Sequence, residues 1–476
     1  MALSGRKREI ESLNRLLASG EAEFLALYGR RRIGKTFLIR EHFKTRLCFE
    51  LTGTKDATLP EQLANFHHAL AQCSRKRREV PGSWQEAFQQ LSEHLQTLRG
   101  QGKRVIFLDE LPWLAGPRSR FLPALDHFWN SELSKDPRNI LVVCGSAASW
   151  MIAKVIDEKG GLHNRITARL KLEPFTLGES ARFLASRKVK LTPYDQLVLA
   201  MVMGGVPHYL KEAQPGNSAA QIIDRCCFSD TGLLRDEFDR LYASLFDHSE
   251  RHVALVRELA RHPQGLTRSD LTTAYGTGGR LTQTLRELEE AGFVSTQDPF
   301  EKKKKDTIYR LADEYSLFYL RWIEGRRQSG AGTFLKKIQS PGWRAWSGYA
   351  LESLAHKHIR QIKQALGIAE VDTEHGSWVH RPDDIWPEGA QIDLLLDRAD
   401  NTVNLFELKF SQGPFTITKD YAGHLRRKLE TFKGVTGTRK NVFLTFLTTH
   451  GVTENAYATE LVHQSLTTDS LFSEGL

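Results

Sequence analysis

Residues 27–37 read LYGRRRIGKTF and contain the pattern GxxxxGKT, which runs from Gly29 to Thr36. The apolar run EFLALY before the pattern is typical of a strand, and the run FLIREHF after it is typical of a helix. In that setting the backbone N–H groups of the loop can surround a phosphate chain at the helix N-terminus, where Lys35 reaches the outer phosphates and Thr36 binds Mg²⁺. The stretch therefore predicts a nucleotide-binding loop in an α/β domain. The predicted nucleotide contacts in and beside this loop are Gly29, Arg30, Ile33, Gly34, Lys35, Thr36 and Phe37.

A second motif supplies the groups that such a loop needs for hydrolysis. The apolar run RVIFLDE at 104–110 is typical of a strand and ends in two acids. Asp109 is placed to hold the Mg²⁺ shell, and Glu110 to orient or deprotonate the attacking water. Because both motifs stand at strand ends, together they predict binding and hydrolysis of ATP with Mg²⁺ as cofactor.

Three further side chains are candidates for the same site. Ser146 follows the apolar run NILVVCG and can contact the terminal phosphate, although a serine in this place is also a common helix cap. Arg165 and Arg169 are candidates for the cation that stabilises the transition state, from the same subunit or a neighbouring one.

Length and composition set the wider frame. The chain has 476 residues, which allows two to four domains, and a net charge of +9 with basic clusters at 30–32, 75–78, 302–305 and 426–428. Such clusters suit a nucleic acid partner, or are merely solvated faces. The five cysteines lack metal-ligand spacing. Without an apolar membrane span or signal-peptide core, we expect a cytoplasmic protein that does not enter a membrane.

The pattern along the chain predicts four domains. Alternating strand-like and helix-like runs at 1–175 indicate a parallel sheet covered by helices, and helical patterns at 176–250 indicate a lid. Three helices and two short strands at 251–330 predict a winged helix-turn-helix, with Lys302–Lys305 at the tip of the wing. This module either contacts DNA or serves as a hinge or protein-binding module. A mixed α/β pattern fills 331–476.

The last domain contains a hairpin with unusual charges. Residues 389–410 read GAQIDLLLDRADNTVNLFELKF, and a three-residue loop at 399–401 would pair residues whose numbers sum to 800. Asp393 then lies beside Glu407 on one sheet face, and Lys409 points to the same face. Two adjacent carboxylates repel unless a cation lies between them, and hard oxygen ligands suit Mg²⁺ or Mn²⁺.

The order of these parts resembles the archaeal-type ATPases of the STAND class, which are relatives of AAA+ ATPases. The matching segments are GRKREIESL at 5–13, the P-loop, FLDELPWL at 107–114, CGSAASWM at 144–151, LEPF at 172–175 and GGVP at 204–207. The resemblance implies that Gly5 and Arg6 lie near the nucleotide base, and that Gly205 and Pro207 in the lid sense the nucleotide state.

Many members of that family continue into a winged helix and a C-terminal domain similar to restriction endonucleases. The residues D…ExK on adjacent strands are similar to the metal-binding core of PD-(D/E)xK nucleases, with Ile392 where the formal pattern has proline. The resemblance implies that Glu352, on the preceding helix, also approaches the metal. Lys409 would orient the attacking water or stabilise developing charge. The predicted metal ligands of the two sites are Thr36, Asp109, Glu352, Asp393 and Glu407.

Two functions remain open at this stage. The first is an ATP-dependent, metal-dependent nuclease with DNA as the expected substrate, and genome defence is the setting it suggests. The second is a nucleotide-switched scaffold that binds DNA or a protein partner, in which Asp393, Glu407 and Lys409 form a structural ion network. Both a monomer and a homo-oligomer fit the sequence.

Overall fold

The computed structural model describes residues 3–74, 76, 78–156, 161–246, 248–276, 278–298, 300, 307–325 and 330–473. It divides into two compact units, Met1–Pro174 with Ser244–Asp247 and Phe175–Ala243 with His248–Leu476. The predicted wing tip, Lys302–Lys305, lies outside the described residues. The division into four domains stays a prediction.

The first unit is built on a parallel five-stranded sheet in the order β2-β3-β4-β1-β5. Its strands are β1 (Glu23–Tyr28), β2 (Leu47–Thr52), β3 (Arg104–Asp109), β4 (Asn139–Gly145) and β5 (Ala168–Lys171). Three of them, β1, β3 and β4, are the strands expected from the apolar runs. The predicted α/β class with a parallel sheet is therefore confirmed for this unit.

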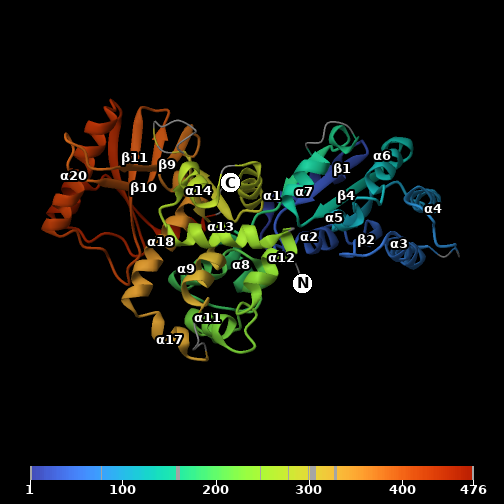
Figure 1. Cartoon of the computed structure of the whole chain (residues 1–476), viewed down its shortest axis with the longest axis horizontal. Coiled ribbons are helices and arrows are strands. Elements are labelled where there is room, and N and C mark those ends of the chain that lie inside the picture. Colours follow the sequence, from blue (N-terminus) through green and yellow to red (C-terminus); the bar gives the residue numbers. More distant parts are fainter. Residues whose placement is uncertain are drawn as a thin grey trace. The chain divides into compact units, whose positions relative to one another are not determined.

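Helices cover both faces of this sheet (Figure 1). Phe24 and Ala26 of β1 face one core, and Leu25 and Leu27 face the other. The helices on the first side are α3 (Leu59–Cys73), α4 (Trp84–Thr97) and α6 (Phe121–Ser131); those on the second are α1 (Lys7–Ala18) and α2 (Lys35–His42). Burial on both faces explains why β4 is apolar without alternation.

Short elements complete the first unit. They are α5 (Leu111–Leu114), a 3₁₀ turn at Leu133–Lys135, α7 (Ala148–Met151), a π turn at Ile152–Ile156 and a 3₁₀ turn at Gly161–Asn164.

The second unit begins with the helices predicted as a lid. They are α8 (Leu177–Ser186), α9 (Pro193–Met203), α10 (Pro207–Leu210), α11 (Ala219–Phe228) and α12 (Glu237–Leu245). The helical pattern breaks between α9 and α10, at Gly204, Gly205 and Pro207. Gly205 accepts a hydrogen bond from the Phe175 N–H at 2.7 Å, and a Cβ at this glycine would lie 1.8 Å from the Phe175 carbonyl oxygen. Only glycine allows this approach of the two backbones.

The segment 249–311 contains the expected three helices and two strands. They are α13 (Ser249–Arg261), α14 (Arg268–Tyr275), α15 (Gly279–Glu290), β7 (Val294–Gln297) and β8 (Ile308–Leu311). Thr267 caps α14, because its Oγ1 accepts a hydrogen bond from the Asp270 N–H. A third short strand, β6 (Leu266–Thr267), pairs with β8 and was not expected. We call this part the three-helix segment.

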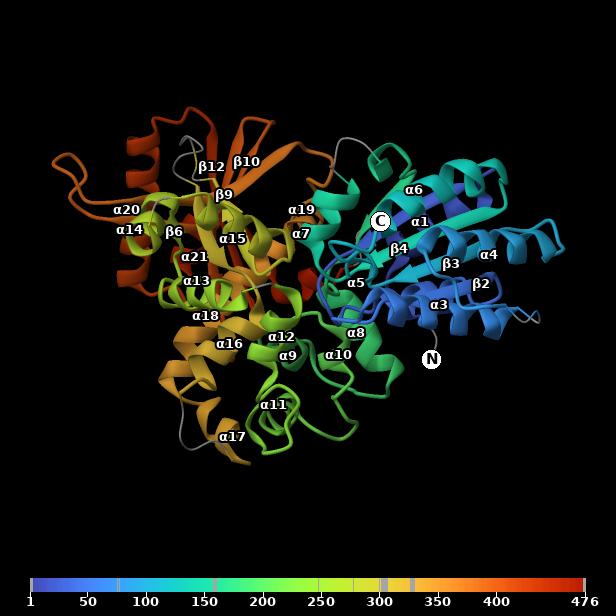
Figure 2. The ribbon, with the colours of Figure 1, turned by 45° about the vertical axis from the view of Figure 1, so that its right-hand side comes forward.

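The remainder of the second unit is a mixed sheet with helices. Its strands are β9 (Thr373–His380), β10 (Ala390–Arg398), β11 (Thr402–Lys409), β12 (Asn441–Thr448) and β13 (Gln464–Thr467), in the order β13-β12-β11-β10-β9. Its helices are α16 (Glu314–Trp322), α17 (Thr333–Lys337), α18 (Pro341–Lys357), α19 (Ile359–Ala365), α20 (Lys419–Thr436) and α21 (Ala456–Leu461), with a 3₁₀ turn at Thr468–Phe472. Both α18 and α20 pack on the central strands β10 and β11. Figure 2 shows α20 along one side of the sheet that contains β10 and β12.

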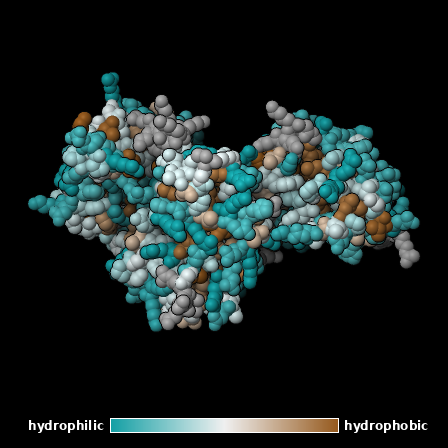
Figure 3. All heavy atoms as spheres, viewed as in Figure 1, coloured by the Kyte–Doolittle hydropathy of each residue, from teal (hydrophilic) through white to brown (hydrophobic). Residues whose placement is uncertain are grey.

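The described surface in Figure 3 is mostly hydrophilic, and its hydrophobic residues occur in small separate groups. The helices that the structure describes include none with the length and apolar character needed to cross a membrane.

One buried histidine joins α8 to the end of α18 and predicts a pH dependence. His358 Nε2 accepts a hydrogen bond from the Leu177 N–H at 3.1 Å, and its Nδ1–H donates to the Leu354 carbonyl at 2.7 Å. Burial lowers the pKa of His358 to about 4, against 6.5 for an ordinary histidine. In the unfolded chain His358 binds a proton below about pH 6.5, whereas in the folded chain it does so only below about pH 4. Acidification from pH 6.5 to pH 4 therefore lowers the free energy of unfolding.

We expect His358→Gln to remove this dependence. At pH 7 the variant should be the less stable protein because it loses fitted hydrogen bonds. Between pH 7 and pH 5 the difference in free energy of unfolding should narrow by about 2 kcal/mol. Urea titrations at both pH values measure this, and a constant difference would contradict the assignment.

Candidate functional site

The loop between β1 and α2 depends on two glycines. Gly29 has φ 139° and Gly34 has φ 91°, a region that favours glycine. A Cβ on Gly29 would lie 2.3 Å from the Leu172 carbonyl oxygen. Ile33 is fully buried and anchors the loop in the core that contains α2. The loop therefore turns tightly from the strand into the helix N-terminus, as the pattern predicted.

Lys35 lies at the centre of this loop. Its Nζ donates hydrogen bonds to the carbonyls of Gly29 and Arg30, each at 2.8 Å, and to Ser146 Oγ at 3.1 Å. Burial lowers the pKa of Lys35, while neighbouring groups that include Glu110 and Asp109 oppose the shift. The ammonium group is thus held between the loop and the end of β4, in a position suited to bind an anion.

The acids at the end of β3 form two separate contacts. Thr36 Oγ1 donates to Asp109 Oδ2 at 2.6 Å, which brings together the two oxygens predicted to share Mg²⁺. Glu110 Oε1 accepts a hydrogen bond from Ser146 Oγ at 2.7 Å. Glu110 also has φ 47°, a left-handed conformation that is costly for this residue type and is common at functional sites. These hard oxygens fit a Mg²⁺ ion beside a bound phosphate chain.

Arg6 links the first helix to the loop. Its guanidinium is buried and donates to the carbonyls of Ile33 at 3.0 Å and Glu173 at 2.6 Å. Gly5, with φ 74°, precedes it. The structure thus brings Arg6 to the predicted nucleotide loop, and the contact with the base stays a prediction.

The remaining predicted residues of this site are placed less directly. Arg165 pairs with Asp126 of α6 at 3.4 Å, and Arg169 donates to the Ile156 carbonyl at 3.5 Å. Among the residues with described positions, neither arginine contacts Lys35 or Glu110. Phe37 is 42% exposed on α2, and Arg30 is buried in the loop. Pro207 and Gly205 belong to the second unit, so their predicted response to nucleotide stays a prediction.

The second candidate site begins at the charged hairpin, whose predicted register is confirmed. Leu394 pairs with Phe406 and Leu395 with Leu405, so paired numbers sum to 800. Asn401 has φ 60°, as the three-residue loop requires. Continued by one step, this register sets Asp393 opposite Glu407. The pairing of β10 with β9 shifts between Ile392 and Leu395, which takes Asp393 out of that ladder.

Glu407 is buried and fully engaged with polar partners. Its Oε1 accepts from Lys409 Nζ at 2.8 Å and from the Tyr421 hydroxyl, and its Oε2 accepts from Lys428 Nζ at 2.8 Å. Burial alone would raise the pKa of Glu407, but Lys428 and Lys409 hold it at about 2. Burial and the neighbouring Glu407 raise the pKa of Tyr421, which stays protonated and donates. Glu407 is therefore a carboxylate anion that forms ion pairs with both Lys409 and Lys428.

Asp393 is held by one hydrogen bond to its backbone carbonyl and one to its side chain. The His356 Nε2–H donates to the Asp393 carbonyl at 2.9 Å, and Gln391 Nε2 donates to its Oδ1 at 2.5 Å. Burial, aided by Arg310, lowers the pKa of His356 to about 3, so this imidazole is neutral. A neutral histidine thus holds the irregular stretch of β10 that presents the carboxylate.

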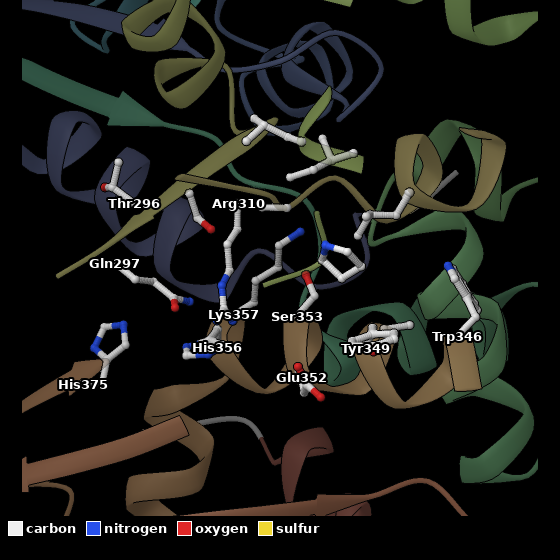
Figure 4. A pocket seen from close by; sticks show the side chains of 17 residues that line it. Thr296, Gln297, Arg310, Trp346, Tyr349, Glu352, Ser353, His356, Lys357 and His375 are labelled. Carbon is white, nitrogen blue, oxygen red and sulfur yellow. The ribbon is translucent and has the colours of Figure 1, made fainter. Parts of the chain in front are cut away.

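Glu352 of α18 completes the group that the resemblance implied. Burial, and then the negative charge of Asp393, raise the pKa of Glu352 to about 8. Arg310 of β8 acts in the opposite direction. A cavity of about 140 Å³ separates β7 and β8 from α18, and Figure 4 shows the labelled side chains that line it, among them Arg310, Glu352 and His356. An acid held neutral beside another acid indicates a shortage of positive charge.

The donor chemistry of these carboxylates fits a divalent cation, since burial and mutual repulsion both favour a bound cation. They are not gathered into a finished ligand set, because the described parts of the chain contain no cluster of three or more His, Cys, Asp or Glu side chains able to hold a metal ion. Each carboxylate oxygen of Glu407 is already paired with a lysine ammonium group, which competes with a metal ion for that oxygen. Ligation by Glu352, Asp393 and Glu407 stays a prediction.

Sequence reasoning missed four residues here: Lys428, Tyr421, His356 and Arg310. Tyr421 and Lys428 are seven residues apart on α20 and so lie on one helix face, which is the signal that a sequence offers once the sheet face is known. His356 follows Glu352 by one helical turn. Arg310 lies on β8, in another segment of the chain, and no sequence pattern predicts that it lies near Glu352.

Residues 3–213 match the family model described as an ATPase domain predominantly from Archaea. An uncharacterized protein of Methanocaldococcus jannaschii is 24% identical over 412 residues, which cover 85% of this chain and 87% of that protein. Among solved structures, a Walker-type ATPase of Pyrococcus abyssi is 18% identical and covers 67% of this chain and 96% of its own, with a TM-score of 0.49. The ORC2 protein of Aeropyrum pernix, solved as ADPNP–ADP complexes, is 19% identical, covering 67% and 93%, with a TM-score of 0.42.

Proposed function

We propose that this chain, which carries an archaeal-type ATPase domain in residues 3–213, is an ATP-regulated, divalent-metal-dependent nuclease. DNA is the expected substrate. The single observation that carries the nuclease half is the hairpin register, in which Leu394 pairs with Phe406. Continued by one step, this register would place Asp393 opposite Glu407, two residues before Lys409. The three-helix segment acts in this proposal as the winged helix between the two activities.

The residues of the first unit have the chemistry that ATP hydrolysis requires. The loop N–H groups and Lys35 would receive the phosphates, and Thr36 and Asp109, whose side-chain oxygens lie 2.6 Å apart, would hold Mg²⁺. Glu110 would orient the attacking water and accept its proton, and its hydrogen bond to Ser146 fixes the position of its carboxylate.

The residues of the second site suit phosphodiester cleavage. A divalent cation held by Asp393 and Glu352 would polarise the scissile phosphodiester and supply positive charge. Lys409 Nζ lies 2.8 Å from Glu407 Oε1. Its ammonium group could orient water or stabilise charge on the phosphate. Lys428 adds a second ammonium group within reach of the same carboxylate. A polyanionic substrate is consistent with the net charge of +9.

One observation favours a second candidate, the nucleotide-switched scaffold. Glu407 has a lysine on each oxygen and a tyrosine hydroxyl as a third partner. A closed network of this kind is also what a purely structural role would produce. In that case the C-terminal sheet domain would bind DNA or a protein partner without cutting.

Cleavage assays with a lysine variant separate these candidates. Circular plasmid, linear duplex and single-stranded DNA are incubated with Mg²⁺ or Mn²⁺, with and without ATP. We expect Lys409→Ala to slow cleavage on the order of a hundredfold or more, because a charge aimed at the reacting phosphate is lost. The matched control is Lys419→Ala, an exposed lysine at the start of α20, which should cut like the wild type.

The result decides between the two functions. Cleavage by the wild type and the control, lost in Lys409→Ala, supports the nuclease. ATP hydrolysis without cleavage of any substrate supports the scaffold, and equal cleavage by Lys409→Ala would show that the activity resides elsewhere.

A further inference from the structure

Arg310 is a buried cation with little local compensation. It lies on β8 of the three-helix segment and is 8% exposed. Its Nε donates to the Gln264 carbonyl at 3.0 Å, and within the described residues no carboxylate lies within 4.0 Å of its guanidinium. Burying an arginine is costly unless negative charge is nearby, so its position calls for an electrostatic explanation.

The nearest source of negative charge belongs to the candidate nuclease site. Burial lowers the pKa of Arg310, and the charges of Glu352 and Asp393 oppose that shift. Figure 4 shows Arg310 reaching from its strand toward the side chains of α18, and the same cavity is lined by Glu352 and His356. Arg310 is buried, and charges interact over longer distances in a protein interior than on a surface.

The two segments that line this cavity come from different parts of the second unit. Glu352 and Asp393 belong to the C-terminal sheet domain, whereas Arg310 is fixed to Gln264 in the three-helix segment. Lys357, a second cation on the cavity wall, is already paired with Glu314 at 2.5 Å. Arg310 is therefore the cation with which the three-helix segment acts on the two acids.

We propose that Arg310 is a positioning residue of the nuclease site, whose charge on the same cavity as Glu352 weakens the binding of a divalent cation there. The inference rests on the proposed function. Any movement that withdraws β8 from α18 would then raise the metal affinity of the site. This gives the three-helix segment a direct means of controlling the nuclease.

Titration of the full chain with Mn²⁺ in the absence of nucleotide tests the proposal. The variants are Arg310→Met, which removes the charge and keeps the length, and Arg310→Lys, which keeps the charge. Arg280→Met, an exposed arginine on α15, is the matched control for a change in net charge. Asp393→Asn identifies the site to which the binding belongs, and thermal unfolding of each variant verifies that it is folded.

We expect Arg310→Met to bind Mn²⁺ on the order of tenfold more tightly than the wild type, and the other two arginine variants to stay within about twofold. Unchanged or weaker binding in a folded Arg310→Met would overturn the proposal while the nuclease site stands. If neither the wild type nor Arg310→Met binds Mn²⁺ at a site sensitive to Asp393→Asn, both the proposal and the metal-dependent function fail. Equal gains in Arg310→Met and Arg310→Lys would show a steric effect and also overturn it.

Discussion

Replacing Lys35 with alanine is expected to abolish ATP hydrolysis, with a loss on the order of a thousandfold, and to weaken ATP binding. Lys35 is the buried cation of the loop, and its three hydrogen bonds tie both loop carbonyls and Ser146 to one ammonium group. Without it the loop loses its charge for the outer phosphates and the bridge to the end of β4. Phosphate release and equilibrium binding of a fluorescent ATP analogue measure the two effects.

Glu110→Gln is the matched variant for this experiment. It keeps the size of the side chain and a carbonyl that can accept the hydrogen bond from Ser146, but it cannot take a proton. We expect it to bind ATP like the wild type and to hydrolyse it about a hundredfold more slowly. Hydrolysis at the wild-type rate in Lys35→Ala would contradict the assignment of the phosphate site.

Asp393→Asn is expected to remove metal binding at the second site and to reduce DNA cleavage on the order of a thousandfold. The asparagine side chain has the same shape, and its oxygen can still accept the hydrogen bond from Gln391. The His356 contact to the backbone is untouched, so the fold should survive. Only the negative charge is lost, and that charge is what both a divalent cation and Arg310 respond to.

Asp397→Asn is the control on the same strand. Asp397 forms an ion pair with Lys440 at the far end of β10, away from Glu352. The same chemical change there should leave Mn²⁺ binding and cleavage unaltered. Equal losses in both variants would mean that the strand has been destabilised and that Asp393 has no special role.

The phosphate site could be predicted almost completely from sequence. Its residues are contiguous or stand at the ends of strongly apolar strands, so the parallel sheet brings Thr36, Asp109 and Ser146 together without further information. The hairpin register was equally predictable, since the three-residue loop with Asn401 leaves only one pairing of β10 with β11.

The other half of the second site was not predictable, because it depends on tertiary packing. The register of β10 against β9 shifts between Ile392 and Leu395, so Asp393 is not part of the regular ladder. No residue type in this stretch predicts such a β-bulge. Lys428 reaches Glu407 from a helix that follows it in the chain, and Arg310 comes from a separate segment. Such partners are found where the folded chain buries a charge, because a buried charge needs a compensating group. A linear motif gives no information about which distant residue will supply that group.

The most direct measurement is the rate of linear duplex cleavage in Mg²⁺, with and without ATP, for the wild type, Lys35→Ala and Asp393→Asn. We predict that the wild type cuts at a rate that changes with ATP, that Lys35→Ala cuts at a rate that ATP does not alter, and that Asp393→Asn does not cut. Cleavage that persists in Asp393→Asn, or no cleavage by a wild-type protein that hydrolyses ATP, would contradict a metal-dependent nuclease at this site.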